Sequence, residues 1–289
     1  MPRILARSSF RPHHPNGEAL ALESVPACER GVTMLRVDLG LTGRRAIVLG
    51  GTRGIGLAIA RGLAAEGCSV AICGRNEAAL RDAESEIGAT GATTYAAVSD
   101  VADPARLGTF LDDARQALGG VDILVHNASA LAVGADAGAW PASLQVDLMG
   151  AVHAVDRVVP WMMDAGGGSI LFVSSISALE AFPLPDFAYT AAKAALIAYA
   201  KKLAVLYGPQ RIRVNAIAPG STEFPGGLWD VVRKTQPPLY EAIRSSIPAG
   251  RLGTLEEVAD VAVFLVSNGA RWVTGECLAV DGGQHKAMR

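Results

Sequence analysis

Short apolar runs alternate with amphipathic stretches along most of the chain from Arg44 onward. Seven runs have the length of a strand and are nearly continuous in apolar residues: 46–49, 69–73, 93–98, 121–126, 169–174, 212–218 and 277–280. Helical patterns fill most of the intervals, at 55–66, 76–87, 104–118, 141–164, 187–207 and 255–267. Such alternation is typical of a parallel sheet that helices cover on both faces. The pattern therefore predicts an α/β fold, a single-domain Rossmann-type doubly wound parallel sheet of about seven strands, which binds ligands at the carboxyl ends of its strands.

Residues 1–38 lack this pattern. Prolines and the pair Asn16-Gly17 interrupt any sustained period, so we expect a poorly ordered N-terminal extension followed by one domain over 39–289. The first acidic residue, Glu18, follows three arginines, which is a feature of organelle transit peptides. A true start at Met34, just before the folded part, is an equally simple interpretation.

The composition of the 289 residues excludes several classes of function. Half of the residues are apolar, and a formal net charge of −2 provides no basic field for a nucleic acid. No apolar run reaches the roughly 18 residues of a membrane span, so we expect no membrane partner and a cytoplasmic location. The cysteines have no metal-ligand spacing, so we predict no metal site and reduced, buried thiols; they are Cys28, Cys68, Cys73 and Cys277.

A glycine-rich turn joins the first strand to the first helix. Its sequence is Gly50-Gly51-Thr52-Arg53-Gly54-Ile55-Gly56. Such a turn directs backbone N–H groups and a helix N-terminus at one point, which favours a phosphate group. Gly50 permits the tight turn, Gly54 permits close approach of a pyrophosphate, and Gly56 permits packing of the helix on the strand. The alternative is a tight turn that binds no ligand.

The residues after the second strand bear on the choice of cofactor. A site for an unphosphorylated dinucleotide usually carries an acidic residue about 20 positions after the glycines, where it binds a ribose hydroxyl. This chain has Gly74 and Arg75 there, and Arg53 lies within the glycine-rich turn. Two guanidinium groups near the adenosine ribose would bind a 2′-phosphate. The sequence therefore favours NADP(H) over NAD(H), unless both arginines are simply solvated.

Candidate catalytic groups lie on the helix at 187–207 and at the end of the strand before it. Tyr189 and Lys193 are four residues apart and share a helix face, and a lysine cation beside a phenol favours the ionised phenol. Ser175 follows the strand at 169–174, where a hydroxyl would face the ligand crevice and donate to a substrate carbonyl. The Tyr–Lys spacing alone is a weak signal, because it also arises by chance.

Nine short motifs, taken in order, resemble the short-chain dehydrogenase/reductase family. They are LGGTRGIG, SDV, HNAS, VDLMG, VSSIS, YTAAK, RVNAIAPG, RLGTLEEVA and TGECLAVDGG. The resemblance extends from about residue 40 to residue 285, which is nearly all of the expected domain. Within the family, the chain looks most like the members described as 3-oxoacyl-carrier-protein reductases.

The resemblance implies a role for each matching position. Ser175 would orient the carbonyl, Tyr189 would exchange the proton, and Lys193 would hold the nicotinamide ribose and favour the ionised tyrosine. Tyr189 and Lys193 would also contact the cofactor. So would the following positions: Gly50, Thr52, Arg53, Gly54, Ile55, Gly56, Gly74, Arg75, Asp100, Val101, Asn127, Ala128, Pro219 and Gly220. A homodimer or homotetramer, paired through the long helices before and after the catalytic segment, is also implied.

Three departures from the family pattern are modest. Leu49 stands where the glycine motif usually begins with Thr, and residues 126–129 read His-Asn-Ala-Ser in place of Asn-Asn-Ala-Gly. The expected serine lies 14 positions before Tyr189, one more than the family spacing, so Ser174 and Ser177 remain lesser candidates.

A fourth departure concerns the proton relay, in which Asp147 replaces the family's Asn. A carboxylate accepts a hydrogen bond from water but has no amide donor, and it would place a negative charge near Lys193. We expect catalytic activity with an altered pH profile, and we count Asp147 among the catalytic candidates.

The segment between Gly220 and Gly250 is long and rich in glycine and proline. Beside a ligand crevice, such an excursion is more typical of a substrate lid than of a connector. Its apolar residues would form one wall of a pocket, opposite residues that precede Tyr189: Phe224, Leu228, Trp229, Val232, Leu239, Tyr240 and Ile243 face Leu179, Phe182, Leu184 and Phe187. A mainly apolar ketone or secondary alcohol fits such a pocket, unless these residues pack on one another or on another subunit.

Two cations of the lid, Arg233 and Lys234, have an alternative use. They would contact an acidic carrier or a substrate carboxylate, whereas solvated surface charge is the simpler interpretation.

Together these features predict an NADP(H)-dependent oxidoreductase with a small-molecule substrate. Hydride would pass between the nicotinamide and an apolar ketone or secondary alcohol, with 3-oxoacyl compounds among the candidates and reduction as the favoured direction. An NAD-dependent secondary alcohol dehydrogenase is one alternative. A dinucleotide-binding sensor with weakened catalysis is the other, favoured by Asp147 and disfavoured by the intact Ser175, Tyr189 and Lys193.

Overall fold

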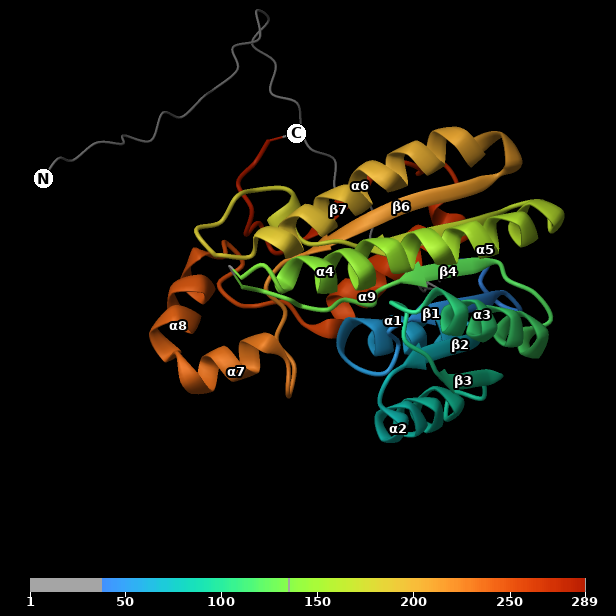
Figure 1. Cartoon of the computed structure of the whole chain (residues 1–289), viewed down its shortest axis with the longest axis horizontal. Coiled ribbons are helices and arrows are strands. Elements are labelled where there is room, and N and C mark those ends of the chain that lie inside the picture. The colour runs from blue at the N-terminus through green and yellow to red at the C-terminus, as the bar shows by residue number, and fades with distance from the viewer. Residues whose placement is uncertain (1–37, 135, 289) are drawn as a thin grey trace, which may run out of the picture. The chain divides into compact units, whose positions relative to one another are not determined.

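Seven parallel strands form the centre of the molecule (Figure 1). The structure is a computed structural model that describes residues 38–134 and 136–288, so the expectation for residues 1–38 lies, except for Asp38, outside the described residues. The strands are β1 (Arg45–Leu49), β2 (Ser69–Gly74), β3 (Thr94–Val98), β4 (Ile123–His126), β5 (Gly168–Val173), β6 (Ile212–Pro219) and β7 (Cys277–Val280). Their order in the sheet is β3-β2-β1-β4-β5-β6-β7. The predicted doubly wound sheet is confirmed, and every predicted strand begins and ends within two residues of the observed one.

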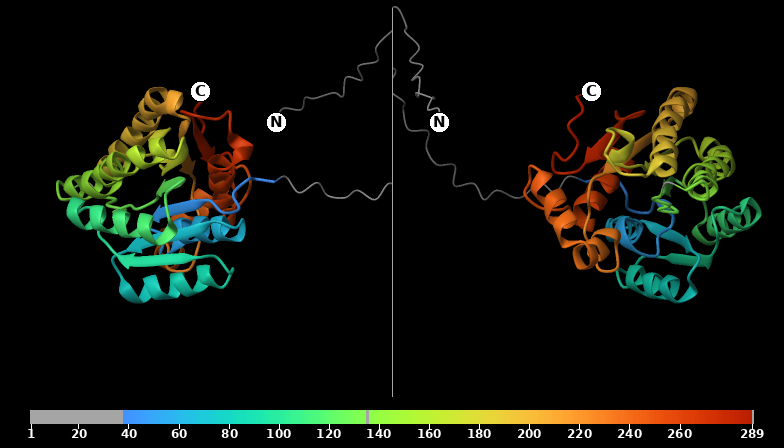
Figure 2. Two further views of the ribbon diagram at one scale, coloured as in Figure 1. Left: turned by 90° about the vertical axis from the view of Figure 1, so that its right-hand side faces the viewer. Right: turned by 60° about the vertical axis from the view of Figure 1, so that its left-hand side comes forward.

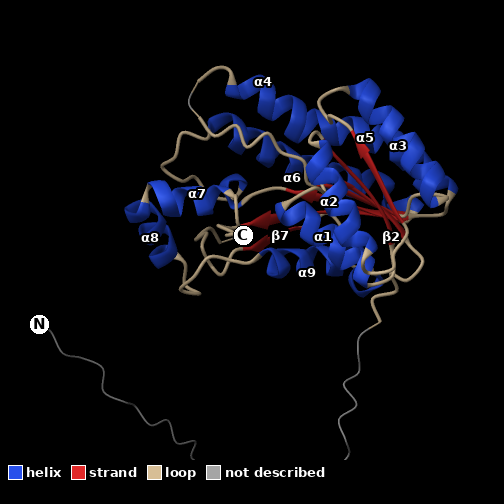
Figure 3. Cartoon of the chain, turned by 90° about the horizontal axis from the view of Figure 1, so that it is seen from below, coloured by secondary structure: helices blue, strands red, loops and turns tan. Residues whose placement is uncertain are grey.

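Helices cover both faces of the sheet (Figure 3). One face packs against α1 (Gly54–Ala65), α2 (Glu77–Gly88) and α9 (Leu255–Val266), and the other against α3 (Pro104–Leu118), α5 (Gly150–Asp164) and α6 (Phe187–Tyr207). Successive residues of a strand point to opposite faces, so Ala46 and Val48 belong to the first core whereas Ile47 and Leu49 belong to the second. Both faces are therefore buried, which explains the nearly continuous apolar runs.

Local signals fix several helix ends. The Asn76 side chain accepts a hydrogen bond from the Ala79 N–H at the start of α2, and Asp103 does the same for two N–H groups of α3. At the start of α9, Thr254 and Glu257 form a reciprocal capping box. Gly119 ends α3 in the left-handed conformation, with φ of 74°.

The prediction of one continuous helix at 141–164 is wrong in detail. A short helix, α4 (Ala139–Ser143), continues into a π-helical turn, Leu144–Met149, and then into α5. The wider π turn changes which side chains face inward, and Asp147 lies within it, completely buried. Because the insertion depends on tertiary packing, the apolar period did not reveal it.

The lid segment has two helices of its own, α7 (Leu228–Thr235) and α8 (Pro237–Ser246). Figure 1 and the right-hand view of Figure 2 show them outside the helix layers that cover the sheet. Among the described residues, no helix is long and apolar enough to cross a membrane.

The chain reverses its direction of winding between β1 and β4. The chain passes outward from β1 to β3 on one side and then returns to place β4 on the other side of β1. In such sheets the crevice beyond the carboxyl ends of the two strands is the usual ligand site. Leu49 and His126, the last residues of β1 and β4, lie opposite each other in the sheet and bring the two following loops together.

Candidate active site

A cavity of about 600 Å³ lies at the carboxyl ends of the strands. The loops after β1, β2, β3, β4, β5 and β6 line it, together with the lid helices α7 and α8. The topology alone places it there, because parallel strands all end at the same edge of the sheet.

The glycine-rich turn forms one end of this cavity. Gly50 and Gly54 have φ values of 75° and 57°, a region that favours glycine, and α1 begins without a side-chain cap. The N–H groups of the first turn of α1 are therefore available to an anion. Gly56 lies behind the turn, where a Cβ atom would be 2.2 Å from the Gly50 carbonyl oxygen.

The loop after β4 supports the glycine-rich turn from the side. The Asn127 side-chain amide donates to the Gly50 carbonyl oxygen at 2.8 Å, and a Cβ atom on Gly50 would be 2.8 Å from the Ala128 Cα. Asn127 and Ala128 also line the cavity, as do Asp100 and Val101 after β3.

Arg53 and Arg75 face the same end of the cavity from the loops after β1 and β2. Both residues are exposed and line the cavity, and neither guanidinium group has a hydrogen-bond or ion-pair partner among the described residues. Gly74 allows the two loops to approach, since a Cβ there would be 2.5 Å from the Thr52 Cγ2. Two unpaired cations beside the glycine-rich turn suit a phosphate group.

The structure distinguishes the two adjacent serines after β5. The Ser174 hydroxyl donates to the Lys193 carbonyl oxygen at 2.8 Å, which ties β5 to α6. The Ser175 hydroxyl oxygen accepts from the Ser177 N–H at 3.2 Å, and its own proton is not used. Ser175, with 8% of its surface exposed, is therefore the serine that can donate to a ligand in the cavity.

Tyr189 and Lys193 lie one turn apart in α6 and both line the cavity. The Lys193 Nζ lies 5.6 Å from the centre of the Tyr189 ring. Only 2% of Lys193 is exposed, and its Nζ donates to the Val173 carbonyl oxygen at 2.9 Å. The ammonium group is thus held by the end of β5 and faces the phenol.

Asp147 lies behind Lys193 and does not line the cavity. Its Oδ1 is 3.0 Å from the Lys193 Nζ, which makes an ion pair in which neither side chain is more than 2% exposed. Its Oδ2 accepts from the Ala130 N–H at 3.0 Å. The π-helical turn thus places a carboxylate beside the lysine that faces the tyrosine.

His126 completes this buried group. Its Nε2 lies 3.0 Å from the Asp147 carbonyl oxygen and donates to it. Complete burial and the nearby Lys193 cation lower the pKa of His126 to about 4. The ring is therefore neutral at neutral pH and positions the π-helical turn by a hydrogen bond.

Apolar side chains form much of the remaining wall of the cavity, and among them Phe224 lies close to Gly54 of the glycine-rich turn. Most of the predicted wall residues line it, namely Phe182, Leu184, Phe224, Leu228, Trp229, Val232, Leu239 and Ile243, whereas Leu179, Phe187 and Tyr240 do not. Phe187 is 58% exposed, and the Tyr240 hydroxyl donates to Glu223 instead. Leu131 and Val133, in the loop after β4, also line the cavity, and no pattern in the sequence indicated them.

Gln284, in the segment after β7, is a third lining residue that the sequence did not indicate. Its side chain accepts from the Ser221 N–H at 2.8 Å and donates to the Ser221 hydroxyl at 2.9 Å. Gln284 is 7% exposed and lines the cavity beside Pro219 and Gly220. A Cβ atom on Gly220 would be 2.6 Å from the Asp281 Cβ, so this glycine permits close packing of the C-terminal segment.

Other potential chemistry is limited in the described part of the chain. No group of three His, Cys, Asp or Glu residues there could hold a metal ion. Cys68 and Cys73 are buried, and burial raises the pKa of each thiol to about 12. Cys28 lies outside the described residues.

The sheet topology, the glycine-rich turn and the Ser–Tyr–Lys group define a dinucleotide-binding oxidoreductase of the Rossmann type. The chain matches the family model described as "Enoyl-(Acyl carrier protein) reductase" over residues 50–285. It is 36% identical over 250 residues to isoepoxydon dehydrogenase patN of Penicillium expansum, covering 85% of this chain and 96% of the relative. It is 34% identical over 250 residues to the 3-oxoacyl-[acyl-carrier-protein] reductase FabG of Chlamydia muridarum, covering 84% of this chain and 98% of that relative.

Two solved structures of oxidoreductases are also similar to this chain. A 7α-hydroxysteroid dehydrogenase in complex with NADH and 7-oxo glycochenodeoxycholic acid has a TM-score of 0.79 and 32% identity, over 85% of this chain and 96% of that chain. L-Sorbose reductase of Gluconobacter frateurii, in complex with NADPH and L-sorbose, has a TM-score of 0.79 and 31% identity, over 87% of this chain and all of that chain. The chain belongs to the short-chain dehydrogenase/reductase family, as the ordered motifs predicted.

Proposed function

We propose that the protein is an NADP(H)-dependent oxidoreductase that interconverts a mainly apolar ketone and its secondary alcohol. The observation that carries the proposal is the convergence of Ser175, Tyr189 and Lys193 on one cavity whose far end holds the glycine-rich turn. The same cavity thus has proton-transfer groups at one end and an anion-binding helix N-terminus at the other. An enzyme that reduces a carbonyl requires both.

The residues at the adenosine end suit a phosphorylated dinucleotide. The uncapped first turn of α1 suits the pyrophosphate, and the unpaired Arg53 and Arg75 suit a 2′-phosphate. No acidic residue follows Gly74 where a ribose hydroxyl would be bound. The two solved relatives contain NADH in one case and NADPH in the other, so the preference for NADP(H) rests on these arginines.

Proton transfer falls to the residues of α6 and β5. Ser175 donates a hydrogen bond to the carbonyl oxygen and fixes its position. Tyr189 donates its proton to that oxygen as the alcohol forms, and Lys193 stabilises the phenolate that remains. When bound, the nicotinamide supplies the hydride in reduction and accepts it in oxidation. The Lys193 Nζ donates one proton to the Val173 carbonyl oxygen, and its contact with Asp147 is an ion pair without hydrogen-bond geometry, so a proton remains for a ribose hydroxyl.

Cofactor titration tests the adenosine end directly. NADPH and NADH are titrated separately into wild type and Arg75→Ala, and the nicotinamide fluorescence reports binding. We expect NADPH to bind at least about tenfold more tightly than NADH, and Arg75→Ala to lose most of that preference, because one charge-assisted contact is worth about 1.5–3 kcal/mol. Equal or tighter binding of NADH would instead favour an NAD-dependent alcohol dehydrogenase.

The sensor alternative is tested by turnover. A sensor would bind the dinucleotide and show no reduction across a broad panel of ketones. The unused proton of Ser175 and the position of Lys193 beside Tyr189 favour an enzyme.

We further propose that the chain forms a homodimer or homotetramer in the cytoplasm. Apolar side chains are exposed on α6 and β7 and in the loop between α9 and β7, where another subunit would cover them: Val205, Leu206, Trp272 and Leu278. Light scattering of the purified protein measures the assembly.

A further inference from the structure

Among the residues that line the cavity, the unpaired positive charges lie at one end. The charged residues that line it are Arg53, Arg75, Asp100, Asp186 and Lys193. The two arginines lie at the adenosine end, and Lys193 is paired with a buried carboxylate. Among these lining residues, no unpaired cation therefore lies at the substrate end, where it could bind an anionic substrate.

The cations of the lid do not change this, because each pairs with a carboxylate of the lid itself. Arg233 lies 3.0 Å from Glu223 and 2.8 Å from Asp230, and Lys234 lies 2.7 Å from Asp230. The two cations, together with the Gly226 N–H, hold the pKa of Asp230 well below its usual range. Asp230 is 5% exposed, so these contacts are part of the folded lid and not chance surface encounters.

The third cation of the lid, Arg244, is also paired. Its guanidinium contacts Glu241 through two nitrogens and donates to the Gly250 carbonyl oxygen. Residues 221–250 thus contain three cations and three carboxylates, which are all hydrogen-bonded or ion-paired within the lid. Both side chains are more than half exposed, so the structure agrees with the simpler expectation of solvated surface charge for Arg233 and Lys234 and adds an ion-pair partner within the lid for each.

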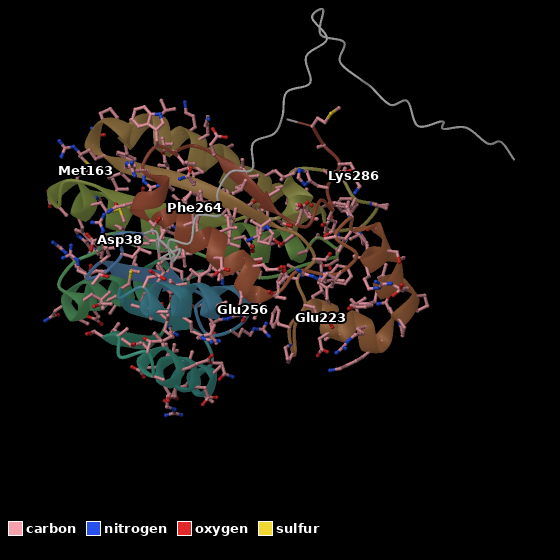
Figure 4. The ribbon with its side chains drawn as sticks, turned by 180° about the vertical axis from the view of Figure 1, so that it is seen from behind. Asp38, Met163, Glu223, Glu256, Phe264 and Lys286 are labelled. Carbon is pink, nitrogen blue, oxygen red and sulfur yellow. The ribbon has the colours of Figure 1, made fainter. Side chains whose placement is uncertain are left out.

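Two segments that contribute walls opposite the lid carry carboxylates, of which Asp186 lines the cavity. Segments 129–146 and 176–188 contain no Lys or Arg, but they contain Asp136, Glu180 and Asp186. Glu180 accepts a hydrogen bond from the Lys286 N–H, and the Lys286 Nζ donates to the Gly283 carbonyl oxygen at 2.9 Å. Figure 4 shows Glu223 and Lys286 at the end of the molecule that carries the lid helices. The lining of the substrate end is therefore apolar apart from the Asp186 carboxylate; Asp186 with Asp136 and Glu180 of the same two segments forms a rim of net negative charge, which Lys286 beside Glu180 reduces by one.

We propose that the substrate is a free, uncharged ketone, and that this rim selects against anionic carbonyl compounds. This inference rests on the proposed function and specifies the substrate class of the same site. The reaction is unchanged: ketone, NADPH and a proton give the secondary alcohol and NADP⁺, with hydride added to carbon and the Tyr189 proton to oxygen. Acyl chains tethered to an acidic carrier protein or to a phosphorylated carrier belong to the disfavoured class, because their charge would meet the carboxylates of the rim.

A pair of substrates that differ only in charge tests the inference. The probes are 5-oxodecanoic acid, ionised at pH 7, and its methyl ester, each reduced with NADPH under steady-state conditions. We expect kcat/KM to be about tenfold higher for the ester at low ionic strength. The difference should shrink in 0.5 M salt, since screening weakens repulsion between exposed charges.

Charge reversal at the rim supplies a second readout. Asp186→Lys should raise kcat/KM for the acid at least about threefold relative to the ester. Asp113→Lys makes the same change on an exposed position of α3 that does not line the cavity, and it should leave the ratio as in wild type.

The possible outcomes distinguish failure of the inference from failure of the proposed function. Turnover of the acid at a rate equal to or above that of the ester, or a preference for a 3-oxoacyl chain bound to a carrier protein, overturns the inference and leaves the proposed reductase intact. Absence of turnover with both probes, and with other neutral ketones, overturns the proposed function and the inference with it.

Discussion

Replacing Asp147 by Asn removes the charge that faces Lys193 and leaves the shape of the side chain nearly unchanged. In the wild type, the carboxylate lies 3.0 Å from the Lys193 Nζ, and that Nζ lies 5.6 Å from the centre of the Tyr189 ring. A negative charge there offsets the stabilisation that the ammonium gives to the phenolate. Asp147→Asn should therefore move the pH profile of activity to lower pH.

The size of the effect follows from these distances. The carboxylate lies within about 9 Å of the ring, where a unit charge at an effective dielectric constant of about 20 contributes about 2 kcal/mol. This corresponds to a shift of roughly 1.5 units in the pH of half-maximal activity. The same substitution leaves the Lys193 cation without its buried partner, so we expect the free energy of unfolding to fall by about 3 kcal/mol.

The assay follows kcat for oxidation of a secondary alcohol with NADP⁺ between pH 5 and 10, because Tyr189 must accept a proton in that direction. The control is Asp122→Asn, which breaks a partly buried pair with Arg45 at the opposite end of β1. The control should be destabilised without any change in the pH profile. If the midpoint of Asp147→Asn stays in place or moves to higher pH, the carboxylate does not act on Tyr189 through Lys193.

Three further predictions concern the surroundings of the site. Because burial lowers the pKa of His126 from 6.5 to about 4, the unfolded chain binds more protons than the folded one between these values. Lowering the pH through this window should reduce the free energy of unfolding by about 3 kcal/mol, and urea titrations of His126→Asn should show a shallower decline. Gly54→Ala places a Cβ about 2.9 Å from the Phe224 ring at a φ of 57°, so fluorescence titration should show NADPH affinity at least about tenfold weaker; unchanged affinity would contradict the role of the turn. Gln284→Ala removes both bonds to Ser221 and should raise KM for the ketone several-fold with a smaller change in kcat, whereas an unchanged KM would make the C-terminal contact irrelevant to the substrate.

The fold could be predicted from the sequence because its signals are local and redundant. Strands buried on both faces appear as continuous apolar runs, and capping residues such as Asp103 and Thr254 mark the helix starts between them. The glycine-rich turn could also be predicted from the sequence, because its glycines are required by the local backbone: a Cβ on Gly56 has no space beside the Gly50 carbonyl oxygen. Each of these features depends on residues close together in the chain.

The features that the sequence left open depend on contacts between distant segments. The roles of Ser174 and Ser175 differ because α6 offers the Lys193 carbonyl to one hydroxyl and not to the other. The pairing of Asp147 with Lys193 requires the π-helical turn, which no apolar period encodes. Gln284 enters the cavity only because the C-terminal segment folds back onto Gly220.

Tyr189→Phe tests most directly whether this cavity performs proton-coupled carbonyl reduction. The substitution removes only the phenolic hydroxyl, so the site keeps its shape and its cofactor contacts. With a neutral ketone and saturating NADPH, we predict a kcat at least about a thousandfold lower than wild type, while NADPH affinity by fluorescence titration stays within about twofold. A variant that binds NADPH normally and retains more than a tenth of the wild-type kcat would show that Tyr189 is not the proton donor.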